Sequence, residues 1–242
     1  MYTFILVHGS WHDGRAWEGV QKHLEGAGHK TFAPTLAGHG PDADRSVTMK
    51  DVTRSLVDYI IEKDLNDFVL VAHSFAGFPI SLTAEQIPDR IRRLVYFSAF
   101  IPFDGCIMMD DVAPENRQLF RDLAKQSKDN TIPVDYNFWR EMLINDADGD
   151  TAQKYFEYLT PEPIQPLEDK IELKTFNTLP LPKSYLLATD DMAIAQGTEY
   201  WWHPRHSSRL GFYRFLSTPG SHELMFSNPE GLAKMIVAAG RD

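Results

Sequence analysis

The stretch Asp67-Phe-Val-Leu-Val-Ala-His-Ser74-Phe-Ala-Gly77 decides the fold of this chain. Its apolar run from Phe68 to Val71 predicts a buried strand, and the small residues that follow Ser74 predict the start of a helix. A serine on such a turn is typical of a nucleophile elbow, in which its Oγ is exposed above a parallel sheet. The residues two before and two after the serine must be small because the two backbones crowd there, and both are alanine, Ala72 and Ala76.

A match of this length is weak by itself, since a serine that precedes a helix also serves as an N-cap. The flanking sequence favours the elbow because strand and helix patterns alternate on both sides of it. Continuous hydrophobicity over residues 93–101 indicates a strand that is buried on both faces. Strands are expected at 3–7, 29–33, 68–71, 93–101, 183–189 and 211–217, and helices at 16–27, 48–62, 196–202 and 229–239.

The alternation is interrupted between residues 103 and 177, where short helical patterns replace it. They lie at 117–126, 138–144, 151–159 and 164–170. This aromatic-rich stretch is predicted to be a helical cap inserted over the strand ends. The expected architecture is an α/β core of residues 1–102 and 178–242, with a six-stranded, mostly parallel sheet, helices on both faces and a cap of residues 103–177.

The composition narrows the class of partner. The 242-residue chain has a net charge of −10, which repels the phosphates of nucleic acids, so we expect no nucleic-acid partner. Its single cysteine, Cys106, allows no internal disulfide, and no Cys/His group has zinc-ligand spacing. No apolar run is long enough to span a bilayer. We expect a cytoplasmic monomer or homodimer that acts on a small molecule with no metal, cofactor or membrane.

Three chemically distinctive groups follow predicted strands in chain order: Ser74, the pair Asp190-Asp191, and His222. The carboxyl ends of parallel strands lie at one edge of a sheet, so these groups are expected to converge. A serine hydroxyl needs an adjacent base to become a good nucleophile. Histidine titrates in the range that suits this task, and a carboxylate orients its imidazole. The set therefore predicts nucleophilic catalysis.

Seven segments carry a family resemblance: Val7-His-Gly-Ser-Trp-His12, Gly26-Ala-Gly-His-Lys30, Ala72-His-Ser-Phe-Ala-Gly77, Ser98-Ala-Phe-Ile-Pro102, Leu159-Thr-Pro-Glu-Pro163, Thr189-Asp-Asp-Met-Ala-Ile194 and Gly220-Ser-His222. With them the chain resembles the α/β-hydrolase superfamily and, more narrowly, the plant methyl-esterase and hydroxynitrile-lyase family and its bacterial relatives. The likeness spans the whole chain and is weakest in the predicted cap. It implies an α/β-hydrolase fold and a serine carboxylesterase that cleaves a small, apolar or aromatic ester through an acyl-enzyme.

Other functions stay open on the same scaffold. They are a lactonase, a thioesterase or amidase, a lyase, and a ligand-binding homologue with slow turnover. The resemblance implies that Ser74 is the nucleophile, His222 the base and Asp191 the acid. The alternatives for the acid are Asp190 and, more remotely, Asp104.

The resemblance also implies the oxyanion hole, formed by the backbone N–H groups of Phe75 and Ser10. Four residues are expected to contact the substrate: Phe100, Trp11, Trp139 and Glu223. Family lyases carry a threonine in place of Gly9 and a lysine in place of Glu223. Without that lysine no cation stabilises a departing cyanide, which favours hydrolysis.

The remaining conspicuous residues have simpler interpretations. His8 is expected to shape the oxyanion loop, His12 to bond to backbone, and His73 to pack within the elbow. His39 is expected to lie in an exposed polar loop. The run Tyr200-Trp-Trp202 is interpreted as part of a helix that packs on the sheet.

Overall fold

The core of the protein is one parallel β-sheet. In this computed structural model, which describes all residues 1–242, the strand order is β2-β1-β3-β4-β7-β8 and every neighbouring pair is parallel. The strands are β1 Thr3–Val7, β2 Lys30–Phe32, β3 Phe68–His73, β4 Ile91–Phe97, β7 Lys183–Ala188 and β8 Arg214–Thr218. The expected six-stranded α/β sheet is confirmed.

Alternate residues of each central strand point to opposite faces, and both faces are buried. In β1, Ile5 and Val7 belong to one hydrophobic cluster, and Phe4 and Leu6 belong to the other. This arrangement explains the unbroken apolar runs of the sequence, because a strand covered on both sides has no polar face.

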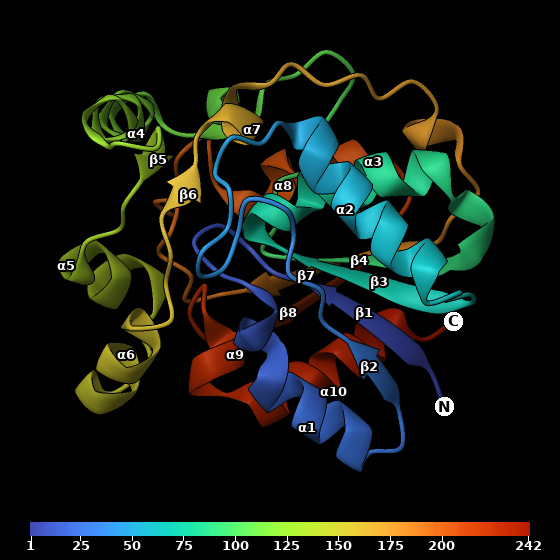
Figure 1. Ribbon diagram of the computed structural model, residues 1–242. Helices are drawn as coiled ribbons and strands as arrows, with labels where there is room; N and C mark the ends of the chain where they lie inside the picture. The colour runs from blue at the N-terminus through green and yellow to red at the C-terminus, as the bar shows by residue number, and fades with distance from the viewer.

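Four helices cover the sheet, two on each face (Figure 1). On one face α2 packs against α3, and on the other α1 packs against α10. Their bounds are α1 Glu18–Gly26, α2 Met49–Glu62, α3 Gly77–Gln86 and α10 Pro229–Gly240. A capping box between Thr48 and Asp51 begins α2 and satisfies two otherwise unpaired N–H groups. No helix of the protein has the length and apolarity needed to cross a membrane.

Residues 98–182, here called the insertion, lie between β4 and β7. Figure 1 shows α4, α5 and α6 of the insertion at the end of the sheet that is remote from both chain termini. Its elements are η4 Met108–Asp111, α4 Pro114–Gln126, β5 Thr131–Ile132, α5 Tyr136–Phe138, η5 Trp139–Leu143, α6 Gly149–Phe156, β6 Glu162–Pro163, α7 Gln165–Glu168 and η6 Phe176–Thr178. The buried side chains of the insertion belong to the same two hydrophobic clusters as those of the sheet. The division of the chain into a core and a cap domain of residues 103–177 stays a prediction.

The structure differs from the sequence-based expectations at several points, and β8 begins at Arg214, three residues later than expected. The antiparallel pair β5–β6 lies where no strand is expected. Strand β4 ends at Phe97, four residues early, because Ser98 has a φ of 37°. No helix covers 196–201, and only α8 Trp202–Arg205 follows. His39 is buried, because it meets a carboxylate of the insertion. The other short elements are η1 Gly14–Trp17, η2 Ser74–Ala76, η3 Pro88–Arg90, η7 Ser207–Leu210 and α9 Leu224–Ser227.

Candidate active site

Ser74 occupies a sharp turn between β3 and α3. Its φ of 54° lies in the left-handed region, which costs a non-glycine residue roughly 1–2 kcal/mol. The turn is tight because α3 begins against the segment after β4, where a Cβ at Gly77 would collide with the carbonyl oxygen of Phe100. Phe100 N–H in turn donates to the carbonyl of Ser74 at 3.1 Å. Ser74 is therefore held at the carboxyl edge of the sheet by backbone contacts on both sides.

Gly9 lets the loop after β1 approach this turn closely. A Cβ at Gly9 would lie 2.8 Å from His73 Nδ1 and 3.0 Å from Ser74 Cβ, so a side chain here would displace the elbow. His8 holds the same loop from behind, because its Nε2 accepts from Leu36 N–H at 3.1 Å. His8 thus has the structural role expected of it. His73 differs from the expectation that it packs within the elbow, because it bonds to the backbone carbonyl of His222 at 3.0 Å and its ring centroid lies 4.5 Å from that of the His222 imidazole.

His222 contacts Asp191, its predicted acid, directly. Its Nδ1 donates to Asp191 Oδ2 at 2.7 Å, and both side chains are buried. Burial opposes a positive charge on the imidazole, but the Asp191 carboxylate outweighs it and raises the pKa of His222. Asp190 points elsewhere and accepts from Gly220 N–H at 2.8 Å, and Asp104 pairs with Lys174 at 3.0 Å. Only Asp191 of the three candidate acids bonds to the imidazole.

The ring of His222 is also held by aromatic contacts. Trp202 stacks on it with 5.4 Å between ring centroids and 7° between planes. The sequence predicts Trp202 in a helix on the sheet and shows no sign of this contact, because only the fold brings residues 202 and 222 together. No hydrogen bond joins Ser74 Oγ to His222, as is common before a substrate binds.

Ser74 and His222 share a cavity of about 480 Å³ between the strand ends and the insertion. This volume is within the range of small-ligand sites. Most of its lining is apolar, and three of the predicted residues, Ser10, Trp11 and Phe100, contribute to it. The other lining residues are Met108, Val112, Ala113, Glu115, Asn116, Phe120, Phe138, Met142, Leu143, Leu167, Ala193, Ile194, Ala195, Thr198, Glu199, Tyr200 and Trp202.

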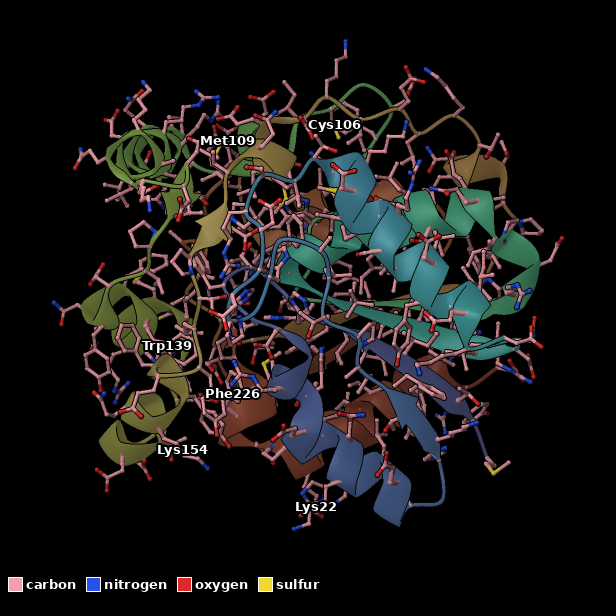
Figure 2. All side chains as sticks on the ribbon, viewed as in Figure 1. Lys22, Cys106, Met109, Trp139, Lys154 and Phe226 are labelled. Atoms are coloured by element: carbon pink, nitrogen blue, oxygen red, sulfur yellow. The ribbon has the colours of Figure 1, made fainter.

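Trp139 and Glu223 are not among the lining residues, so the expectation that they contact the substrate is not met. Trp139 is fully buried and donates from Nε1 to the carbonyl of Ala152 at 2.8 Å. Figure 2 shows its label next to that of Phe226, and the two rings lie 6.0 Å apart where η5 meets α9. The apolar ring of Trp139 packs on Phe226 of the core while its N–H bonds within the insertion, so the residue joins the insertion to the core and does not face a ligand.

Glu223 lies behind the imidazole of His222 rather than in the cavity. It is buried beside His12, with 3.5 Å between Glu223 Oε2 and His12 Nε2. Burial raises the pKa of Glu223, because the charged form loses its hydration, and His12 opposes this shift. Glu223 and Asp191 both favour a positive charge on His222. His12 also bonds through Nδ1 to the carbonyl of Ser10 at 2.6 Å, as expected for a backbone-bonded loop histidine.

The substitution Glu223→Gln is expected to change the pH dependence of catalysis. It removes a negative charge that raises the pKa of His222, so this pKa falls. The base must be neutral to accept a proton, so the acid limb of the kcat/KM profile moves to lower pH. The profile is measured with a neutral ester from pH 4 to 9. Asp191, His73 and His12 remain around the imidazole, and the exposed Glu230→Gln serves as the control. An acid limb that stays in place, or moves to higher pH, would contradict this role.

Comparison with known proteins places the chain in a family. Residues 4–235 match the family model described as the alpha/beta hydrolase family. A solved extracellular alpha/beta-hydrolase from a Paenibacillus species is 42% identical with a TM-score of 0.97, and the alignment covers 100% of both chains. That protein is described as sharing structural and functional homology with tobacco salicylic acid binding protein 2.

Two curated relatives are esterases. The carbendazim hydrolyzing esterase of Nocardioides sp. is 38% identical over 112 residues, or 45% of this chain and 46% of that esterase. Methylesterase 7 of Arabidopsis thaliana is 36% identical over 104 residues, or 41% of this chain and 40% of the methylesterase. The alignments thus span less than half the length of these two relatives. The resemblance to plant methyl esterases is confirmed, and the chain belongs to the alpha/beta hydrolase family.

Proposed function

We propose that this protein is a serine-dependent carboxylesterase that acts on small, neutral, mostly apolar esters. The observation that carries the proposal is the strained Ser74, which opens into the same apolar cavity as the Asp191-bonded His222. The names of its esterase relatives agree with this reaction class. An enzyme of this kind needs no cofactor, because the protein itself supplies the nucleophile, the base and the hydrogen-bond donors for the oxyanion.

In the first half-reaction, Ser74 Oγ attacks the ester carbonyl while His222 Nε2 accepts its proton. The Nδ1–H of His222 stays bonded to Asp191, which stabilises the imidazolium. The carbonyl oxygen becomes an oxyanion, for which the N–H groups of Phe75 and Ser10 are the proposed donors. The tetrahedral intermediate collapses, the C–O bond to the alcohol breaks, and the imidazolium protonates the departing alkoxide.

The second half-reaction repeats this chemistry with water. His222 removes a proton from water, the hydroxide oxygen bonds to the acyl carbon, and Ser74 leaves with the returned proton. The acid product then dissociates. In this proposal the insertion limits access of bulk water, because Met108, Phe120, Phe138 and Leu167 line the cavity opposite the sheet.

Charge at the cavity sets the expected substrate class. Glu115 and Glu199 contribute carboxylates to its lining, and no lysine or arginine does. An anionic ester must therefore approach two like charges without a compensating cation. Neutral esters of about drug-fragment size fit the apolar lining without this penalty.

We expect dimethyl succinate to be cleaved faster than its monomethyl half-ester, which carries one carboxylate at neutral pH. The expected difference in kcat/KM is about tenfold at low salt and smaller at 0.5 M salt, since the repulsive carboxylates are exposed. The double variant Glu115→Gln, Glu199→Gln should narrow this ratio, and the exposed Glu157→Gln should not. Equal rates for both esters in the wild type would remove the assignment to neutral substrates.

Labelling with a fluorophosphonate probe tests the reaction class. Mass mapping should locate the adduct on Ser74, and prior heat denaturation should abolish labelling. A panel of methyl, aryl, lactone, thioester and amide substrates then separates an esterase from the other hydrolases, and absence of turnover despite labelling would indicate a binding protein. Cytoplasmic location and oligomeric state stay predictions, and the Paenibacillus relative is described as extracellular.

A further inference from the structure

Glu162 is a fully buried carboxylate that the reaction above does not use. It lies on β6 in the insertion and accepts a hydrogen bond from Trp11 N–H at 2.8 Å. The same carboxylate lies 3.1 Å from Nε2 of His39, which is also buried. Removing a carboxylate from water is expensive unless hydrogen bonds and an opposite charge compensate. Glu162 has both, in a position 151 residues from Trp11 in the sequence.

Glu162 holds one end of the peptide unit between Ser10 and Trp11, and His12 holds the other. The N–H of this unit donates to Glu162, and its carbonyl accepts from His12 Nδ1 at 2.6 Å. With both ends bonded, the plane of the peptide cannot rotate freely. Its orientation sets the ψ angle of Ser10, whose own N–H belongs to the preceding peptide unit and is the proposed oxyanion donor.

Trp11 itself is held in an unfavourable conformation by further bonds to the insertion. Its φ is 63°, in the left-handed region that a bulky residue avoids. Its carbonyl accepts from Thr160 N–H at 2.8 Å, and its Nε1 donates to the carbonyl of Ile132 at 2.9 Å. Such strain persists only where the surroundings over-determine the conformation, and it concentrates at functional sites. Here the surroundings are Ile132 of β5, Thr160 just before β6 and Glu162 of β6, whose bonds to Trp11 hold it in this conformation.

We propose that Glu162 is a positioning residue for the oxyanion hole, through which the insertion fixes the Ser10 amide for the transition state. The inference rests on the esterase function proposed above. It assigns to the insertion a role in the chemical step, in addition to shaping the cavity. Donors that are held in place before reaction stabilise a developing oxyanion without reorganisation.

The charge state of the buried pair His39 and Glu162 shows which substitution of Glu162 is informative. His39 Nδ1 lies 3.0 Å from the carbonyl of Ala37 and must donate to it, so Nε2 donates to Glu162 only when the ring is protonated. Burial opposes that charge, and the Glu162 carboxylate outweighs it and raises the pKa of His39. In Glu162→Gln the amide oxygen still accepts from Trp11, and the amide nitrogen donates to a neutral His39. Glutamine therefore keeps both contacts without a buried charge.

The test compares Glu162→Ala with Glu162→Gln, using the pre-steady-state acylation rate and substrate affinity for p-nitrophenyl acetate. Alanine should slow acylation by about 10- to 100-fold, because a misplaced donor loses transition-state binding, and should leave substrate affinity within about threefold. Glutamine should stay within about fivefold of the wild-type rate, since a neutral hydrogen bond replaces a charged one. Exposed Glu157→Gln in the same insertion is the matched control.

A trifluoromethyl ketone gives a second readout. Ser74 adds to its carbonyl, the Ser74 proton passes to His222, and the resulting hemiketal oxyanion occupies the oxyanion hole. Its inhibition constant should weaken in Glu162→Ala in parallel with the acylation rate. If the alanine variant does not fold by circular dichroism, Glu162→Met keeps the volume, removes the acceptor and carries the same expectation.

Wild-type acylation and inhibition in a folded Glu162→Ala or Glu162→Met would overturn the inference, as would a glutamine variant as slow as alanine. A loss that appears only in substrate affinity would also overturn it, because it would assign Glu162 to binding. Failure of the esterase function is separate, since it appears as absence of fluorophosphonate labelling at Ser74 in the wild type.

Discussion

Replacing Ser74 by alanine is expected to reduce ester hydrolysis by at least about 10⁴-fold, because loss of the nucleophile removes the acyl-enzyme route. Binding of substrate should change little, since Ser74 is one of many lining residues and the apolar ones stay in place. Turnover of p-nitrophenyl acetate measures the loss of activity. The affinity for a non-hydrolysed amide analogue shows whether the cavity still binds a ligand. A Ser74→Ala enzyme with the wild-type rate would show that another residue is the nucleophile.

A glycine at the same position separates catalysis from strain. Ser74→Gly should be as inactive as the alanine variant, yet more stable to unfolding by about 1 kcal/mol. The reason is that glycine adopts the φ of 54° without the steric cost that alanine shares with serine. Urea denaturation of both variants measures the difference. Equal stabilities would mean that the elbow holds no strain in solution.

The second large effect is expected from Asp191→Asn, which should lower kcat by about 10³- to 10⁴-fold. Asparagine keeps the shape but presents either a neutral oxygen or an N–H to His222 Nδ1. The imidazole then loses its charge partner and is driven toward the wrong tautomer, in which Nε2 is protonated and accepts no proton from Ser74. Steady-state kinetics with a neutral aryl ester measure the loss.

Asp190→Asn is the matched control one residue away. Asp190 accepts from Gly220 N–H, and an asparagine oxygen still accepts that bond, so the rate should stay within about threefold of the wild type. The opposite ranking of the two variants would transfer the role of the acid to Asp190. Both variants should unfold at similar urea concentrations if the loss in Asp191→Asn is catalytic.

Much of the architecture is predictable because its signals are local. A parallel strand covered on both faces needs an apolar run, and such runs are visible at residues 4–7 of β1, 68–72 of β3 and 185–188 of β7. The expected strand at 93–101 ends four residues later than β4 does, because the apolar run continues past the turn at Ser98. The helix expected at 196–202 is absent, because Gly197 has a φ of 78° and the backbone of Trp201 has a non-helical ψ of 146°. Trp202 instead stacks on His222, a contact with no local signature in the sequence.

The partners of buried polar residues are the features least visible in the sequence. His39 lies in a glycine-rich polar loop and shows no sign in the sequence of its partner Glu162, 123 residues away. Glu223 follows the base histidine in the sequence, which predicts a place for it in the substrate cavity. In the structure its side chain lies beside His12, 211 residues away in the sequence, and the helical turn α9 begins at the next residue.

The amino-acid sequence by itself determined the buried strands, the turn that carries Ser74, and the chain order of hydroxyl, carboxylate and imidazole, because each is visible in local runs of residues or in their order along the chain. Only the tertiary structure decided which carboxylate bonds to His222, which aromatic rings line the cavity, and that Glu162 holds the loop of Ser10. These contacts join residues that lie far apart in the sequence, for example 31 positions for Asp191 and His222 and 151 positions for Trp11 and Glu162. Such contacts arise from the packing of the insertion on the sheet, which no local pattern of residues specifies.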